Sequence, residues 1–365
     1  MKYASKLLGV ASISVLVALG ASPAYAAGTQ AGTSITNTAQ INYSVNNVAQ
    51  TAGSASNTVL VDRKVIFTVN NVGATTTVTP GQSVAYDTFT VANTSNDTLD
   101  FSLSAVNQAI GASAQHGGTD AFGVSGFTYF IDTNGNGTYD SGTDQQITYL
   151  DEVAPDTSKT VFVVASVPLT ATNTQVSGIV LTAQGQLGGT PGTQGANLVA
   201  STGAWTPGTV QTIFADAAGT GGLDAQYDDK YSAKGDYTVY APVLTLTKQS
   251  TIVSDPINGT TNPKSIPGAT IEYCIVVQNG SGGAPTTALS VSDPLPTTVT
   301  YLSSFGIVLN GTYTGTTCNT DGTTGTVANS SFATATSGNS GTANGTLNNV
   351  SAGGATTMRI RATIN

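Results

Sequence analysis

One short stretch of this chain has the residue types and spacing of a calcium-binding loop. Oxygen-bearing side chains occupy alternate positions from Asp132 onward, and Gly137 follows the third of them, where a sharp turn is needed. Thr143 stands where the helical calcium hand has a bidentate Glu, and Asp144 comes one place later. We predict Ca²⁺ ligands at Asp132, Asn134, Asn136, Thr138, Asp140 and Asp144.

The residues on either side of this loop indicate whether strands or helices flank it. Residues 127–131 and 145–150 alternate like strands, which favours a calcium-bound β-hairpin over a helix-loop-helix hand. The alternative is an Asn-Gly-rich turn without an ion, in which the Asp side chains cap their own backbone.

The rest of the chain holds few groups that could catalyse a reaction. His116 is the single histidine, and Glu occurs only at positions 152 and 272. His116 falls in an expected exposed loop with no second metal ligand nearby, so no metal or nucleophile-activating role is expected there. We therefore predict no enzymatic activity and no catalytic residues. A hydrolase built on two of the aspartates is the third-ranked hypothesis.

Two further groups of residues have alternative interpretations. The aspartates of a second acidic patch are interpreted as a solvated loop, or else as another cation site; they are Asp216, Asp224, Asp228, Asp229 and Asp236. Lys248 is expected to pair with Glu272. The alternative is a covalent crosslink between Lys248 and Asn365 beside that acid, as in some surface sandwiches.

The two cysteines, Cys274 and Cys318, are predicted to form a disulfide, because an exported chain with two cysteines most economically pairs them. The alternatives are free thiols or an intermolecular bond.

The N-terminus predicts export. Lys2 and Lys6 precede an apolar run from Leu7 to Gly20, and Ala24-Tyr25-Ala26 fits a cleavage site, so residues 1–26 are predicted to be a signal peptide. A membrane anchor is the alternative. No later segment is apolar enough to cross a membrane. Cleavage would take the formal net charge of −9 two units lower, and such an acidic chain is a poor partner for nucleic acid.

Beyond residue 26 the pattern is that of an all-β protein. Period-two alternation recurs about every ten residues, Asn-Gly turns separate the runs, and no helical periodicity is sustained. We predict two tandem antiparallel β-sandwiches at 63–240 and 241–365, preceded by a strand segment at 27–62. That segment pairs within its own chain or with the edge of a neighbour. A long loop is expected at 186–209, and continuous strands at 298–309 and 356–364.

The C-terminal region resembles a known family. The runs Leu244–Lys248, Asp255–Lys264, Ile266–Tyr273, Val276–Asn279 and Val291–Pro296 are similar to the bacterial conserved-repeat domain, domain of unknown function number eleven, over about 243–365. The resemblance implies immunoglobulin-like sandwiches and an extracellular or cell-surface location, and it implies no catalytic residues.

These observations predict an exported structural protein of the bacterial cell surface. It would be a subunit of a fibre or layer, stiffened by calcium, that associates with itself or other surface components through exposed strand edges at 35–61 or 356–364. The alternative is an adhesin or carbohydrate-binding module whose long Gly/Thr loops contact a glycan.

Overall fold

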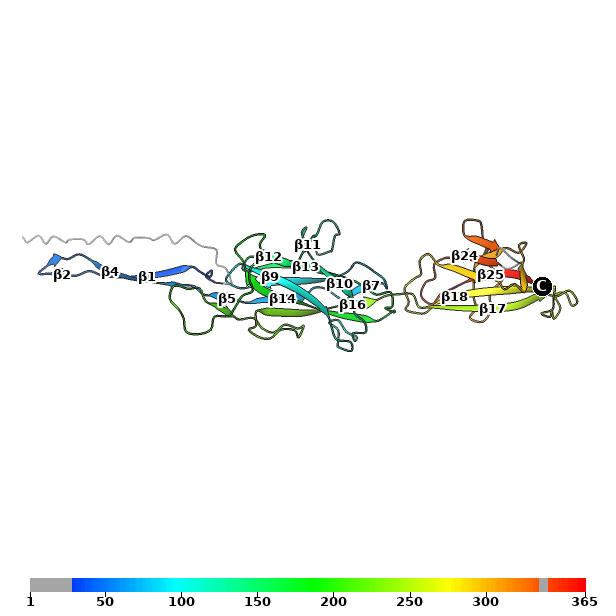
Figure 1. The fold of residues 1–365 in the computed structure, drawn as a ribbon, viewed down its shortest axis with the longest axis horizontal. Coiled ribbons are helices and arrows are strands. Elements are labelled where there is room, and N and C mark those ends of the chain that lie inside the picture. The colour runs from blue at the N-terminus through cyan, green and yellow to red at the C-terminus, as the bar shows by residue number, and fades with distance from the viewer. Residues whose placement is uncertain (1–27, 335–340) are drawn as a thin grey trace, which may run out of the picture.

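The computed structural model describes residues 28–334 and 341–365, and in those residues every regular element is a β-strand. Figure 1 shows an elongated molecule in which a two-stranded ribbon, a larger β-sandwich and a smaller β-sandwich follow one another along the long axis. This confirms the predicted all-β sandwich class. The predicted signal peptide, residues 1–26, lies outside the described residues.

The larger sandwich packs two five-stranded sheets against each other. The first has the order β11–β10–β13–β8–β6 and the second β12–β9–β14–β16–β7. The strands are β6 (Phe67–Asn71), β7 (Thr76–Val78), β8 (Ala85–Asn93), β9 (Leu99–Asn107), β10 (Ser125–Ile131), β11 (Gln145–Ile147), β12 (Tyr149–Val153), β13 (Thr157–Ser166), β14 (Val176–Leu187) and β16 (Lys230–Val239).

Most neighbours in these sheets are antiparallel, as predicted, but β7 pairs parallel with β16. A separate two-stranded sheet pairs β5 (Arg63–Val65) parallel with β15 (Thr212–Phe214). The predicted long loop is present: no named strand lies between the end of β14 and the start of β15.

The core of the larger sandwich follows from the period-two pattern. Alternate residues of β8 point between the sheets, and Phe89 and Val91 are fully buried. The rings of Phe67 and Phe101 meet across the core with centroids 4.8 Å apart. The buried hydroxyl of Tyr237 donates to the Val163 carbonyl at 3.1 Å, so this polar group is satisfied inside the core.

The smaller sandwich has its own hydrophobic core, which includes Ile275, Leu309, Met358 and Ile360. One sheet has the order β17–β18–β25–β21–β22, with β20 also on β25; the other has the order β19–β24–β23. The strands are β17 (Leu244–Ser254), β18 (Thr270–Asn279), β19 (Ser290–Pro294), β20 (Val299–Tyr301), β21 (Ile307–Gly311), β22 (Thr323–Thr324), β23 (Ser330–Thr334), β24 (Gly341–Thr346) and β25 (Ala355–Ile364).

Two strand predictions in this sandwich were wrong. The run 298–309 is interrupted between β20 and β21, where Gly306 adopts a φ of 75° that breaks the extended backbone. The run 356–364 is not an exposed edge, because β25 pairs with β18 on one side and with β20 and β21 on the other. Its alternation places Met358, Ile360 and Ala362 in the hydrophobic core, and it does not reveal the position of the strand in the sheet.

The segment 27–62 pairs with itself. β1 (Ser34–Ile41) and β4 (Gly53–Leu60) form an antiparallel ribbon whose tip carries β2 (Ser44–Val45) and β3 (Val48–Ala49). Asn46 and Asn47 close the tip with φ values of 48° and 67°, as two-residue hairpins require. The ribbon projects from the larger sandwich at the end of the molecule away from the C-terminus (Figure 1).

Candidate functional site

The predicted calcium loop joins β10 to β11, and its carboxylates accept hydrogen bonds from the loop's own backbone. Asp132 accepts from the amides of Gly135 at 2.7 Å and Gly137 at 2.9 Å. Asp144 accepts from the amides of Thr133 at 3.1 Å and Asp140 at 2.7 Å. In this arrangement the two carboxylates fix the turn itself.

The asparagines of the loop point their amide nitrogens at Asp140. Asn134 Nδ2 lies 2.9 Å and Asn136 Nδ2 lies 2.6 Å from Asp140 Oδ2, and these two donors lower the pKa of Asp140. The Asn134 oxygen accepts from the Asn136 amide, and the Asn136 oxygen accepts from the Thr138 amide. The structure thus brings all six predicted ligands into one loop. An ion beside Asp140 would require both amides to rotate their oxygens inward.

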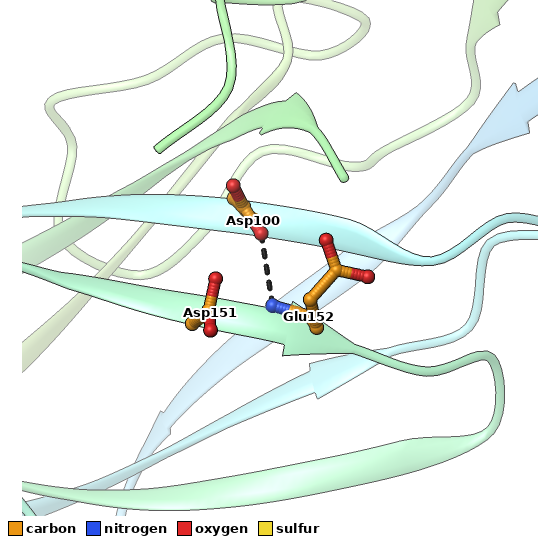
Figure 2. Close-up of side chains that lie close together, drawn as sticks. All are labelled: Asp100, Asp151 and Glu152. Carbon is orange, nitrogen blue, oxygen red and sulfur yellow. Dashed lines mark hydrogen bonds between the residues drawn. The ribbon is translucent and has the colours of Figure 1, made fainter. Parts of the chain in front are cut away.

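A different acidic cluster has the tighter geometry. In residues 28–334 and 341–365, one group of three metal-ligating side chains has ligand atoms that all lie within 4.8 Å of one another: Asp100, Asp151 and Glu152. Figure 2 shows Asp100 on β9 beside Asp151 and Glu152 on the neighbouring β12. This cluster could hold a metal ion, and the sequence analysis missed it.

A β-bulge is what brings the cluster together. Successive residues of a regular strand point to opposite faces, so Asp151 and Glu152 would be separated. The pairing of β12 with β9 shifts register between Leu150 and Val153, and Glu152 adopts a φ of 49°. The consecutive acids are visible in the sequence, but the bulge that aims both toward Asp100 is not.

The same carboxylates accept hydrogen bonds from the loop after β14. Glu152 Oε1 accepts from the amides of Gly189 and Thr190, and Asp151 accepts from Gly192 at 2.9 Å. Asp100 is fully buried, and it accepts from the backbone amides of Glu152 at 2.8 Å and Gly195 at 2.9 Å. The three carboxylates therefore hold the glycine-rich loop after β14 by accepting hydrogen bonds from its backbone amides.

The five aspartates of the second acidic patch lie in two separate parts of the larger sandwich. Asp216, Asp224, Asp228 and Asp229 gather in the loop between β15 and β16, whereas Asp236 lies on β16. Asp236 is fully buried and lies 3.0 Å from the Nδ1 of His116. Asp216 and Asp229 are also buried, so the interpretation of this patch as a solvated loop was wrong for three of its five members.

The cysteine prediction is confirmed: Cys274 on β18 and Cys318 form a disulfide with an S–S distance of 2.01 Å. The expected Lys248–Glu272 pair was wrong, and so was its alternative, the Lys248–Asn365 crosslink. Lys248 Nζ lies 2.6 Å from Asp293, and Asn365 contacts Thr300. Glu272 pairs instead with two arginines, Arg359 and Arg361.

The ribbon β1–β4 presents two unlike faces to solvent. Cross-strand pairing places Ile35 opposite Val59 and Ala39 opposite Ala55 on one face, which Ile41 extends. The Asn37–Asn57 pair lies between them, so this largely apolar face also carries one polar pair. The other face carries hydroxyls, such as the Thr36–Thr58 pair at 2.8 Å. Ile35 and Ile41 are 51% and 62% exposed. A two-stranded ribbon of this kind has little stability of its own in water.

Comparison with known proteins finds no family model that matches this chain and no curated protein that is similar to it. In the described part of the chain, no helix is long and apolar enough to cross a membrane.

Proposed function

We propose that this chain is an exported, non-enzymatic structural protein of the bacterial cell surface whose copies associate head to tail through the β1–β4 ribbon. One observation carries the proposal. The ribbon is exposed on both faces, and residues 28–61 contain no Asp, Glu, Lys or Arg, although the chain has a net charge of −9. Soluble proteins normally protect projecting strand edges with charges, so an uncharged ribbon is suited to pairing.

The smaller sandwich offers an exposed strand edge on β17. Among the described residues β17 pairs with β18 alone, so the backbone donors and acceptors of its other edge have no strand partner there. Leu244 and Leu246 on this strand are 49% and 67% exposed. We propose that the ribbon of one copy adds to the β17 edge of the next. Contacts of this head-to-tail kind produce an open filament when the rotation between copies does not close a ring.

The two faces of the ribbon provide a matched test. Ile35→Lys with Ile41→Lys places two charges on the apolar face, whereas Thr36→Lys with Thr38→Lys places the same charges on the polar face of the same strand. We expect the native chain and the threonine variant to form filaments in electron micrographs and the isoleucine variant to stay monomeric in light scattering. Identical behaviour of the two variants, or a native chain that is monomeric at high concentration with and without calcium, would contradict the proposal.

Mixed cysteine variants test which edge the ribbon meets. One preparation carries Thr38→Cys on β1, and the other carries Thr245→Cys on β17. We expect an oxidised dimer that forms predominantly when the two preparations are mixed. A dimer that forms equally within each preparation alone would argue for a ribbon-to-ribbon or edge-to-edge contact instead.

We also propose that Ca²⁺ binds the loop 132–144 and rigidifies it. Three carboxylates and two asparagines within one hairpin loop support this, since Ca²⁺ prefers oxygen ligands in a flexible shell. A bound ion stabilises the folded form by mass action, so chelation should lower the melting temperature of the native chain more than that of Asp132→Asn. Equal shifts in both proteins would contradict calcium binding at this loop.

The alternative function is an adhesin or carbohydrate-binding module. Trp205, half exposed in the long loop between β14 and β15, could stack on a sugar ring. A glycan array that detects binding by the native chain and loses it in Trp205→Ala would favour this alternative. No binding to any glycan would count against it.

A further inference from the structure

The loop between β15 and β16 encloses two buried carboxyl groups that have too few partners. Asp216 and Asp229 are 0% and 1% exposed. Neither carboxylate oxygen of Asp229 accepts a hydrogen bond of good geometry, and Oδ1 of Asp216 accepts none either. No ion pair formed by the described residues includes either aspartate. Three buried oxygens, each with a lone pair to offer, therefore lie in one loop.

The backbone of the loop holds these two side chains near each other. The amide of Asp228 donates to Asp216 Oδ2 at 3.3 Å, and the amide of Tyr227 donates to the Asp216 main-chain carbonyl at 3.1 Å. The amide of Gly185 on β14 points at the main-chain carbonyl of Asp229 at 3.1 Å. These bonds bring the two ends of the loop together, and they do not satisfy the Asp229 carboxylate.

The neighbouring acids of the loop are already occupied. Asp228 accepts from the amides of Ala225 at 2.9 Å and Lys230 at 3.1 Å. Asp224 accepts from the Gly219 amide at 2.6 Å and from the Ser232 hydroxyl. Within this loop, the buried carboxylate oxygens without a hydrogen-bond partner therefore belong to Asp216 and Asp229.

Electrostatics makes this arrangement unfavourable without a positive charge. Asp216 and Asp229 are both buried, and three of their four carboxylate oxygens have no hydrogen-bond partner. The carboxylate of Asp228 lies on the residue next to Asp229 and adds a further negative charge. Two adjacent buried carboxylates stay ionised together only if a cation lies beside them. Without a cation, one of them takes up a proton.

The carboxylate of Asp229 packs closely against Gly185 of β14. A Cβ atom on Gly185 would lie only 2.3 Å from Asp229 Oδ1, so a residue with a side chain at this position would press directly on the carboxylate. Gly185 does not have a positive φ, which means that close approach, and not backbone conformation, favours glycine here.

We propose that Asp216 and Asp229 are ligands of a divalent cation of the Ca²⁺ class. The donors are all carboxylate oxygens, which suits a hard cation. Main-chain carbonyls and water would complete a shell of six to eight oxygens. This second site is separate from the loop 132–144 and does not depend on the proposed assembly.

The test measures calcium binding to the mature chain by isothermal titration and by melting with Ca²⁺ or chelator. Asp229→Asn removes the ligand charge at nearly constant volume. Asp228→Asn is the matched control, since it removes the same charge from the adjacent residue whose carboxylate is already hydrogen-bonded. Asp132→Asn reports on the other loop. We expect Asp229→Asn to bind one ion fewer than the native chain, and Asp228→Asn and Asp132→Asn to keep the ion at this site.

The stability of the variant in chelator distinguishes loss of a ligand from misfolding, because a misfolded variant would be less stable than the native chain there. Without a cation, Asp229→Asn should be at least as stable as the native chain at pH 8, since it removes a buried like charge. Asp216→Asn, a second variant, should lose the same ion. Equal stoichiometry and a dissociation constant within twofold of native in both variants would overturn the proposal. So would the absence of any bound ion in Asp132→Asn, which would mean that a proton neutralises the pair.

Discussion

Asn93 and Asn279 have equivalent roles at the ends of β8 and β18, in different sandwiches. The buried amide of Asn93 donates to the carbonyls of Asp97 and Val153 at 2.9 and 2.8 Å. The buried amide of Asn279 donates to the carbonyls of Ala284 and Val350 at 2.8 and 3.1 Å. Each oxygen also accepts from a backbone amide, that of Ser95 or Val243. Both sandwiches therefore use one asparagine to satisfy the backbone where a central strand ends.

Replacing either asparagine should destabilise its own sandwich. Asn93→Ala or Asn279→Ala leaves two carbonyls and one amide without a partner, and each substitution should reduce the free energy of unfolding by about 3 kcal/mol. Urea unfolding followed by tryptophan and tyrosine fluorescence would measure this. The exposed Asn70, whose side chain makes only a 3.4 Å contact with Thr68, is the control, and Asn70→Ala should change little. Losses no larger than that of the control would contradict the assignment.

The buried carboxyl of Asp87 makes stability depend on pH. Burial raises its pKa from 3.8 to about 7 against a hydrogen bond from Asn71 and one from the Thr88 amide; the charge of Asp236 adds to the increase, and His116 opposes it. The folded state therefore binds this proton more tightly than the unfolded state. Its contribution to stability is complete below pH 4 and is lost as the pH rises through about 7.

Asp87→Asn should remove this dependence. The difference in unfolding free energy between the native chain and the variant should change by at most about 4 kcal/mol between pH 4 and pH 8, in favour of the variant at high pH. Chemical denaturation of both proteins across that range, in chelator, measures the difference. A difference that does not vary with pH would show that the carboxyl stays ionised throughout.

The disulfide should stabilise only the smaller sandwich. Cys274 and Cys318 are 44 residues apart in sequence, and a crosslink across such a loop restricts the unfolded chain by about 4 kcal/mol in the chain-entropy description. Cys274→Ser with Cys318→Ser, or reduction of the native chain, should lower the stability of that sandwich and leave the larger one unchanged. Calorimetry would resolve the two transitions. Equal shifts in both would indicate that the sandwiches unfold as one unit.

The acidic cluster should control the mobility of the loop after β14. Asp100→Asn weakens the charge-assisted bonds to the amides of Glu152 and Gly195, a loss of about 2 kcal/mol. Amide hydrogen exchange at residues 189–195 should then become at least tenfold faster. Asp151→Asn, which loses only the bond from Gly192, should have a smaller effect limited to that amide. Unchanged exchange in Asp100→Asn would contradict this role.

Much of the fold was predictable because strand formation leaves a local signature. The alternation in Ile271–Val277 predicted β18, and Ile275 and Val277 belong to the hydrophobic core of the smaller sandwich, which identifies the face that packs inward. The position of a strand in its sheet has no such signature. The alternating run that became β25 was expected at an edge, but it lies at the centre of its sheet because β18, β20 and β21 pair with both of its sides.

The sequence by itself determined the β class, the disulfide partners and the oxygen-rich loop at 132–144, since each depends on composition or on spacing within a short stretch. Only the tertiary structure decided which acids meet. Asp216 approaches Asp229 because a loop folds back, and Asp100 meets Glu152 because a bulge turns one side chain across to the neighbouring strand. Such contacts depend on register and loop closure, which are set by the packing of the whole sheet and not by the residues on either side.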